Sequence, residues 1–173
     1  MDLTTLKTAL DQAAGMLDRV DAGDVTRPTP CSDWDVGSLV DHLVASPGNF
    51  ATMVRGERPD WSAPTPHLDA GWPEAFRSSS ADLLAAWDAV QGDPPTVPSW
   101  QCAELAVHTW DLGIALDAPL DGLDPAPAEE GLAFMTANLK PEMREGAFGP
   151  EQPAPAGASA YDRIAAFAGR TVP

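Results

Sequence analysis

The sequence predicts an all-α protein, a four-helix bundle with accessory helices toward the C-terminus. Apolar residues recur at spacings of three and four in several segments, the period of a helix that buries one face. Strand signals are nearly absent, because β-branched and aromatic residues never alternate with polar ones over more than a few positions. The 173 residues fit one domain, so we expect a single domain over residues 1–173.

The first two helices flank a proline-rich connection. The first is expected from Leu3 to a point between Asp21 and Gly23, and residues 27–31 then form a rigid extended linker, because proline restricts its own φ and the residue before it. Asp35 can cap the second helix, which begins at Val36. Pro47-Gly48 must kink or break that helix before helical structure resumes toward residue 56.

Three further helices and one short C-terminal helix are expected from the same spacing. They span about residues 72–90, 99–116, 126–139 and 161–168. Residues 57–71 show no period and are expected as a loop, and the Pro/Gly-rich segment 141–159 is expected to lack regular structure. Bundles of this kind place ligand and metal sites on side chains that face one another in the interior.

Composition excludes several partners. The chain has 26 acidic and 10 basic residues and a formal charge of −16, which repels phosphate backbones and anionic lipids, so we expect no nucleic acid and no membrane partner. No apolar run is long enough for a membrane span, and the N-terminus has no basic segment leading into an apolar one, so we expect a cytoplasmic protein. Cys31 and Cys102 do not form a disulfide framework and are interpreted as reduced structural thiols.

Polar side chains converge on one stripe of the helix expected near residues 99–116. Glu104 and His108 are four residues apart, and Asp111 follows three residues later, so all three share a face flanked by apolar residues. They therefore point inward or into a cleft, where they need partners. The alternatives are an exposed Glu–His pair and, for Asp111, a carboxylate on the helix surface.

A second polar stripe crosses the helix that begins at Val36. His42 shares its face with Ser38, Ser46 and Asn49. The alternative is a core histidine that bonds a neighbouring backbone group or hydroxyl. His67 lies in the proline-rich loop and is expected to be exposed.

If these two helices face each other, His42, Glu104 and His108 form a His2Glu set for one divalent metal. Such a set leaves a fourth zinc position open for water or substrate, which is the catalytic pattern. Zinc is the expected ion, although nickel, iron or manganese could occupy the same ligands.

Several motifs resemble the metal-binding DinB-like proteins, in the subgroup of the mycothiol-dependent maleylpyruvate isomerase N-terminal domain. The resemblance rests on Thr29-Pro30-Cys31-Ser32-Asp33-Trp34-Asp35-Val36, Asp41-His42-Leu43, Glu104 to Leu112, Phe148-Gly149-Pro150, Tyr161-Asp162-Arg163 and Gly169-Arg170. It implies a DinB-like bundle whose metal ligands are His42, Glu104 and His108, with Asp111 orienting a ligand or hydrogen-bonding near the pocket. The isomerase has a further C-terminal domain for which this chain has no room, so we expect a reaction other than maleylpyruvate isomerisation.

The candidate residues and the resemblance lead to three hypotheses about function, the first two from different classes. The first is a metal-dependent thiol transferase or isomerase, in which a small thiol attacks a small electrophile; the resemblance implies mycothiol or bacillithiol as cosubstrate. The second is a non-catalytic module that binds the metal or a small ligand. The third is an interaction protein with a buried histidine and no metal. A homodimer is left open.

Overall fold

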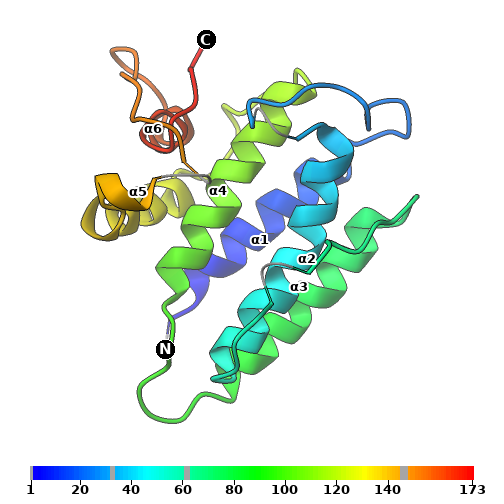
Figure 1. The fold of residues 1–173 in the computed structure, drawn as a ribbon, viewed down its shortest axis with the longest axis vertical. Coiled ribbons are helices and arrows are strands. Elements are labelled where there is room, and N and C mark those ends of the chain that lie inside the picture. The colour runs from blue at the N-terminus through cyan, green and yellow to red at the C-terminus, as the bar shows by residue number, and fades with distance from the viewer. Residues whose placement is uncertain (1, 32–33, 61–62, 145–147) are drawn as a thin grey trace.

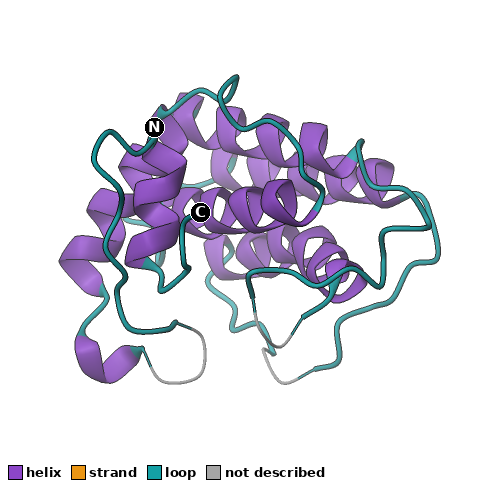
Figure 2. Cartoon of the chain, turned by 90° about the horizontal axis from the view of Figure 1, so that it is seen from above, coloured by secondary structure: helices purple, strands orange, loops and turns teal. Residues whose placement is uncertain are grey.

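The computed structural model describes residues 2–31, 34–60, 63–144 and 148–173, and every regular element in that part of the chain is a helix (Figures 1 and 2). The all-α prediction is therefore confirmed. The helices are α1 (Thr4–Leu17), α2 (Val36–Val54), α3 (Trp72–Asp88), α4 (Pro98–Ala115), α5 (Ala126–Asn138) and α6 (Ala160–Phe167), with a 3-10 turn η1 (Pro141–Met143) after α5. The first helix ends at Leu17, before the predicted end between Asp21 and Gly23, and η1 lies in a segment predicted to be irregular.

The first four helices form the predicted bundle, and α5 and α6 are the accessory helices. Packing contacts join α1 to α3 and α4, and α2 to α3 and α4, which closes a four-helix ring. In Figure 1, α4 lies between α1–α3 on one side and α5 and α6 on the other. One core cluster fills the bundle and a second lies between α4, α5 and α6.

Helix α4 is buried on both sides, and this determines where its polar stripe can go. Cys102 and Leu105 face the core of the bundle, whereas Ala106 and Trp110 face α5 and α6. A helix that is apolar around most of its circumference belongs in the interior of a protein. The polar side chains on α4 therefore lie deep in the molecule and need partners there.

The sequence predicts a kink or a break of the helix at Pro47-Gly48. A break is wrong, because α2 runs without interruption from Val36 to Val54. Proline removes one backbone N–H and crowds the preceding turn, which costs about 3 kcal/mol in a helix interior. Pro47 is itself buried, on a helix that also buries Leu43 and Phe50, and packing against α3 and α4 compensates for the lost hydrogen bond. His42 and Asn49 thus stand on one rigid element.

The connection from α1 to α2 is ordered, as its prolines predict. The backbone N–H of Val36 donates to the carbonyl of Arg27 at 2.9 Å, and the hydroxyl of Thr29 donates to the carbonyl of Trp34 at 2.7 Å. Asp35 caps α2 by accepting the N–H of Ser38 at 2.9 Å. Ser32 and Asp33, which belong to the motif in this connection, lie outside the described residues.

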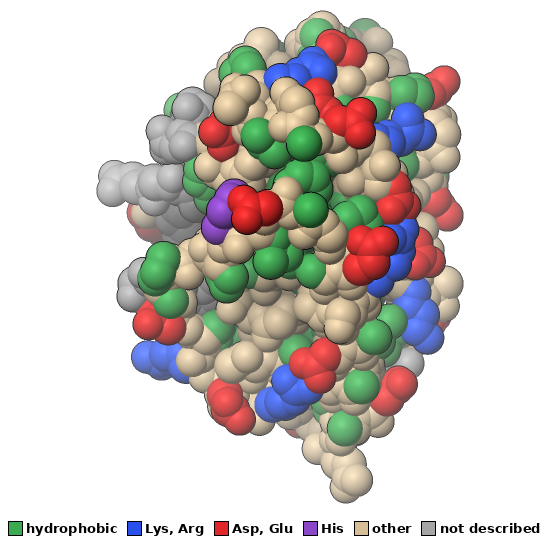
Figure 3. Space-filling view, turned by 90° about the vertical axis from the view of Figure 1, so that its right-hand side faces the viewer, with side chains coloured by type: hydrophobic (Ala, Val, Ile, Leu, Met, Phe, Trp, Pro, Cys, Tyr) green, Lys and Arg blue, Asp and Glu red, His purple; other side chains and the backbone are tan. Residues whose placement is uncertain are grey.

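On the surface shown in Figure 3, acidic side chains are scattered among apolar and basic ones and are not gathered into a single patch. Such a distribution is typical of a solvated acidic surface. Within the described residues, no helix combines the length and apolarity that crossing a membrane requires.

Candidate metal centre

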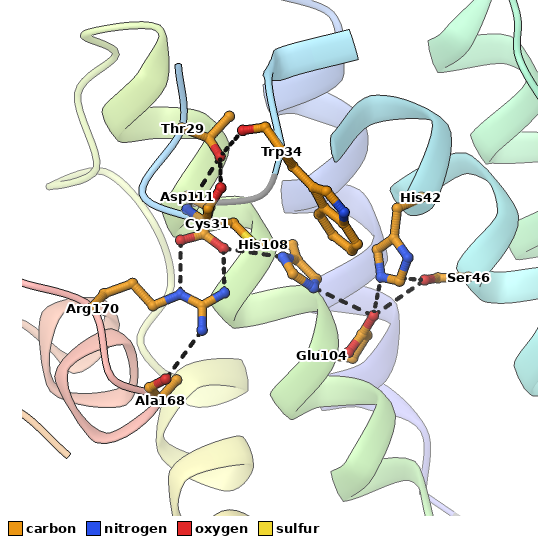
Figure 4. A network of polar contacts seen from close by, with 10 residues as sticks. All are labelled: Thr29, Cys31, Trp34, His42, Ser46, Glu104, His108, Asp111, Ala168 and Arg170. Atoms are coloured by element: carbon orange, nitrogen blue, oxygen red, sulfur yellow. Dashed lines mark hydrogen bonds and ion pairs between the residues drawn. The ribbon is translucent and has the colours of Figure 1, made fainter. Parts of the chain in front are cut away.

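The structure brings together the three side chains that the sequence assigns to a metal. His42 comes from the middle of α2, and Glu104 and His108 come from successive turns of α4 (Figure 4). Nε2 of His42 lies 2.5 Å from Oε1 of Glu104, and Nε2 of His108 lies 3.5 Å from the same oxygen. One donor atom from each residue lies within 4.8 Å of the other two.

This donor set fits a divalent ion. Tetrahedral zinc with bonds of 2.0 to 2.2 Å holds neighbouring donor atoms about 3.4 Å apart, so modest side-chain adjustments would suit it. Two imidazole nitrogens and one carboxylate oxygen are borderline ligands of the kind that zinc prefers. Helical spacing places Glu104 and His108 on one stripe, and the contact between α2 and α4 brings His42 opposite them.

The charges at the centre are coupled. Burial alone would raise the pKa of Glu104, but the charge on His108 and the hydrogen bond from His42 outweigh it and lower the pKa to about 2. Burial alone would lower the pKa of His108, but the Glu104 carboxylate and the hydrogen bond to Asp111 outweigh it and raise the pKa. Glu104 is therefore ionised, with its carboxylate hydrogen-bonded to His42 and paired in charge with His108.

Asp111 extends the centre away from the cavity. Its carboxylate has no exposed surface, and Oδ2 lies 3.1 Å from Nδ1 of His108. The alternative of a surface carboxylate is therefore wrong. Arg170 donates from Nε to Oδ1 at 3.1 Å and from Nη2 to Oδ2 at 2.8 Å, so the carboxylate is satisfied on both oxygens. Burial would raise the pKa of Asp111, but the hydrogen bonds from His108 and Arg170 lower it below its usual range.

The polar stripe predicted on α2 is only partly used. Ser46 is buried and its hydroxyl lies 3.3 Å from Oε1 of Glu104, whereas Ser38 bonds the capping Asp35 instead. His42 has the Glu104 carboxylate as its closest partner, not a backbone group. His67 is exposed, as predicted, and its Nδ1 lies 2.6 Å from Oδ2 of Asp41, outside the centre.

The centre opens into a cavity of about 720 Å³. The Trp34 ring lies 4.6 Å from the ring of His42 and 5.6 Å from that of His108, and so covers both imidazoles on one side. Helices α2, α4 and α5, the loop after α2 and the C-terminal segment all contribute to the walls. Among the residues of these walls are Asn49, Asp60, Trp100, Phe134, Met135, Leu139, Phe148 and Arg170.

Sequence reasoning missed the role of Arg170, which lies 59 residues from its partner Asp111. The local signal is Gly169, whose φ of +96° favours glycine and turns the chain after α6. A Cβ on Gly169 would lie 2.6 Å from Cα of Gly149, so two glycines let these backbone segments meet. The motifs Phe148-Gly149-Pro150 and Gly169-Arg170 are therefore one structural unit that holds Arg170 over Asp111.

Comparison with known proteins gives one family match and two similar sequences. A family model described as the mycothiol maleylpyruvate isomerase N-terminal domain matches residues 6–113, which include the triad and Asp111 but end before α5. Two uncharacterized proteins of Mycobacterium tuberculosis, from strains H37Rv and CDC 1551, are each 30% identical over 173 residues, covering 95% of this chain and 94% of the relative. No solved structure matches the chain significantly. With its helical bundle and family match, the chain belongs to the mycothiol maleylpyruvate isomerase N-terminal domain family.

Proposed function

We propose that the protein binds one divalent metal, Zn²⁺ by preference, through His42, Glu104 and His108, and joins a small thiol to a small electrophile at that metal. The reaction type is a thiol transfer or a thiol-dependent isomerisation. The observation that carries the proposal is the convergence of three donor atoms within 4.8 Å at the wall of a cavity of about 720 Å³. The family supports a small thiol as one substrate, with mycothiol as the first candidate and bacillithiol as the second.

The proposed role of each residue follows from its contacts. The chemistry that a metal supplies at such a site is to lower the pKa of a bound thiol, so that the thiolate is available at neutral pH. Three protein ligands leave one position for that thiol. Glu104 contributes one negative charge, Asp111 holds the ring of His108 through Nδ1, and Trp34 shields both imidazoles from water on one side.

The choice among metals rests on the ligand atoms. Two histidines and one carboxylate suit Zn²⁺, and Ni²⁺, Fe²⁺ and Mn²⁺ accept the same atoms with different affinities. Elemental analysis of protein expressed without added metal, followed by titration of metal-free protein with each ion, identifies the one that is retained.

The activity test uses 1-chloro-2,4-dinitrobenzene with mycothiol, and then with bacillithiol. The thiol sulfur forms a bond to the ring carbon, chloride leaves with the bonding electron pair, and the thiol proton goes to solvent. We expect turnover by zinc-loaded protein and by His67→Ala, whose imidazole lies outside the centre, but not by metal-free protein or His108→Ala. Rates no higher than the uncatalysed reaction with both thiols contradict the catalytic proposal for this electrophile class.

A non-catalytic metal- or ligand-binding module is the second candidate. It is favoured by one observation: among the described wall residues, no histidine other than His42 and His108 is available as a general base. In that case zinc raises the melting temperature, as any ligand of the native state does, but no thiol transfer accompanies it.

A further inference from the structure

The cavity has two unlike walls. The triad forms a polar wall on α2 and α4. A second, largely apolar part of the lining is formed by the start of α4, by α5 and by the segment that follows α5. Its side chains are Trp100, Phe134, Met135, Leu139 and Phe148, and we call them the α5 wall.

The α5 wall keeps apolar surface open to the cavity. Trp100 is 36% exposed, and Phe134, Leu139 and Phe148 are only partly buried against the second core cluster. Apolar side chains that line a concave site are the usual source of affinity for an uncharged ligand. Four of the five wall residues come after residue 113, so most of this wall lies outside the family match.

The cavity offers no available cation among its described lining residues other than the histidines of the centre. Among the described residues that line the cavity, Arg170 is the one Lys or Arg side chain, and it is 7% exposed. Its Nε and Nη2 bond Asp111, and Nη1 donates to the carbonyl of Ala168 at 3.1 Å. The lining also contains the carboxylates of Asp60 and Glu104. A carboxylate or phosphate on the substrate would therefore lose its water without gaining a counter-charge on the α5 wall.

We infer that the electrophile is neutral and apolar, of about the size of one or two aromatic rings, and that it lies on the α5 wall with its reactive atom toward the triad. This inference rests on the proposed function and names the substrate class of the same site. A cavity of about 720 Å³ is large enough for such a group beside part of a thiol cosubstrate.

The binding test needs no turnover. The neutral fluorescent probe N-phenyl-1-naphthylamine is titrated into the full chain, with and without zinc, and is then displaced by 1-naphthamide or by 1-naphthoate, which have the same ring system and differ in charge. In the metal-free form, where no ion can coordinate the carboxylate, we expect the amide to displace the probe at a concentration at least about tenfold lower than the carboxylate. Equal displacement, or a preference for 1-naphthoate, in the metal-free form overturns the inference.

Matched variants locate the probe. Phe134→Ala and Trp100→Ala each remove an aromatic side chain from the α5 wall, and we expect about tenfold weaker probe binding. Leu132→Ala removes a partly buried side chain from the same helix that does not line the cavity, and should leave binding within about twofold. If Phe134→Ala unfolds, the exposed Trp100 still provides the test. Unchanged probe binding in the folded α5-wall variants overturns the inference.

A kinetic comparison of two substrates tests this inference separately from the proposed function. 4-Chloro-3-nitrobenzoate undergoes the same chloride displacement as 1-chloro-2,4-dinitrobenzene but carries a carboxylate. With rates expressed relative to the uncatalysed reactions, we expect kcat/KM to favour the neutral substrate by at least about tenfold. Turnover that favours the carboxylate overturns the inference alone, whereas absent turnover with intact, amide-selective probe binding counts against the catalytic function alone.

Discussion

Nδ1 of His108 lies 3.1 Å from Oδ2 of Asp111, less than one helical turn further along α4. Because the pKa of Asp111 is lowered, its carboxylate is ionised and can only accept, so Nδ1 of His108 carries the hydrogen. In the neutral ring this leaves the lone pair on Nε2, the atom that faces Glu104. Asp111 therefore fixes both the tautomer and the orientation that a metal-binding His108 requires.

Asp111→Asn tests this relationship without changing the size of the side chain. We expect zinc affinity to fall about 10- to 100-fold, because the orienting anion is lost. We also expect the free energy of unfolding to fall by about 3 kcal/mol, because the buried guanidinium of Arg170 loses its counter-charge. Chelator competition and urea unfolding measure the two effects. Asp88→Asn, at an exposed position, should change neither, and wild-type affinity in Asp111→Asn contradicts the assigned role.

His108→Ala is expected to abolish metal retention. The substitution removes one of three donor atoms, and two ligands on opposite helices hold zinc at least about a hundredfold more weakly than three. Metal content after dialysis, measured by elemental analysis, gives the result. His67→Ala is the control, because His67 lies outside the centre and should leave the stoichiometry at wild-type level. Full retention in His108→Ala is incompatible with the proposed ligands.

Much of the fold and the triad could be predicted because both depend on local periodicity. A spacing of four residues puts Glu104 and His108 on one stripe of any helix, and the polar stripe through His42 marks the face of α2 that turns toward a partner. Periodicity does not predict whether a proline interrupts a packed helix. Pro47 removes a hydrogen bond locally, but tertiary packing of α2 keeps the helix continuous.

The remainder of the site depends on contacts between distant segments. Arg170 reaches Asp111 only because Gly149 and Gly169 allow two backbone segments to meet, and helical periodicity does not encode that meeting. The α5 wall was equally difficult to predict from the sequence. Helix α5 buries Gly131 and Met135 against its neighbours and leaves Phe134 partly exposed to the cavity, so its apolar residues do not form one simple stripe.

Gly131→Ala tests how closely α5 must approach α4. A Cβ at this position would lie 2.6 Å from Cα of Ala103 and 2.8 Å from its nitrogen, so backbone must move. We expect a loss of about 1 to 3 kcal/mol in unfolding free energy and altered probe binding, because α5 carries Phe134. Gly15→Ala, an exposed helical position with no atom within 4 Å, should instead stabilise by about 0.5 to 1 kcal/mol. Destabilisation of equal size in both variants contradicts the close-approach explanation.

The buried thiol of Cys102 gives the protein a predictable alkaline sensitivity. Burial, with a smaller contribution from the charge of Glu130, raises the pKa of Cys102 to about 12 from a usual value of 9.0. A raised pKa means that the neutral thiol favours the folded state below pH 9, and that this contribution is lost progressively as the pH rises from 9 toward 12. The loss reaches about 1 kcal/mol at pH 10, because the unfolded chain ionises there and the folded one does not.

Urea unfolding at pH 8, 9 and 10 under reducing conditions measures that loss as a difference between proteins. Cys102→Ala leaves a small cavity that lowers stability equally at each pH, but it removes the titrating group, so its curve should decline less by about 1 kcal/mol at pH 10. Cys31→Ala retains the buried thiol and should keep the full decline that Cys102 produces. Parallel pH curves for the wild type and Cys102→Ala would contradict the raised pKa of Cys102. They would mean that the thiol ionises as readily in the folded chain as in the unfolded one, although Cys102 is buried in the core of the bundle.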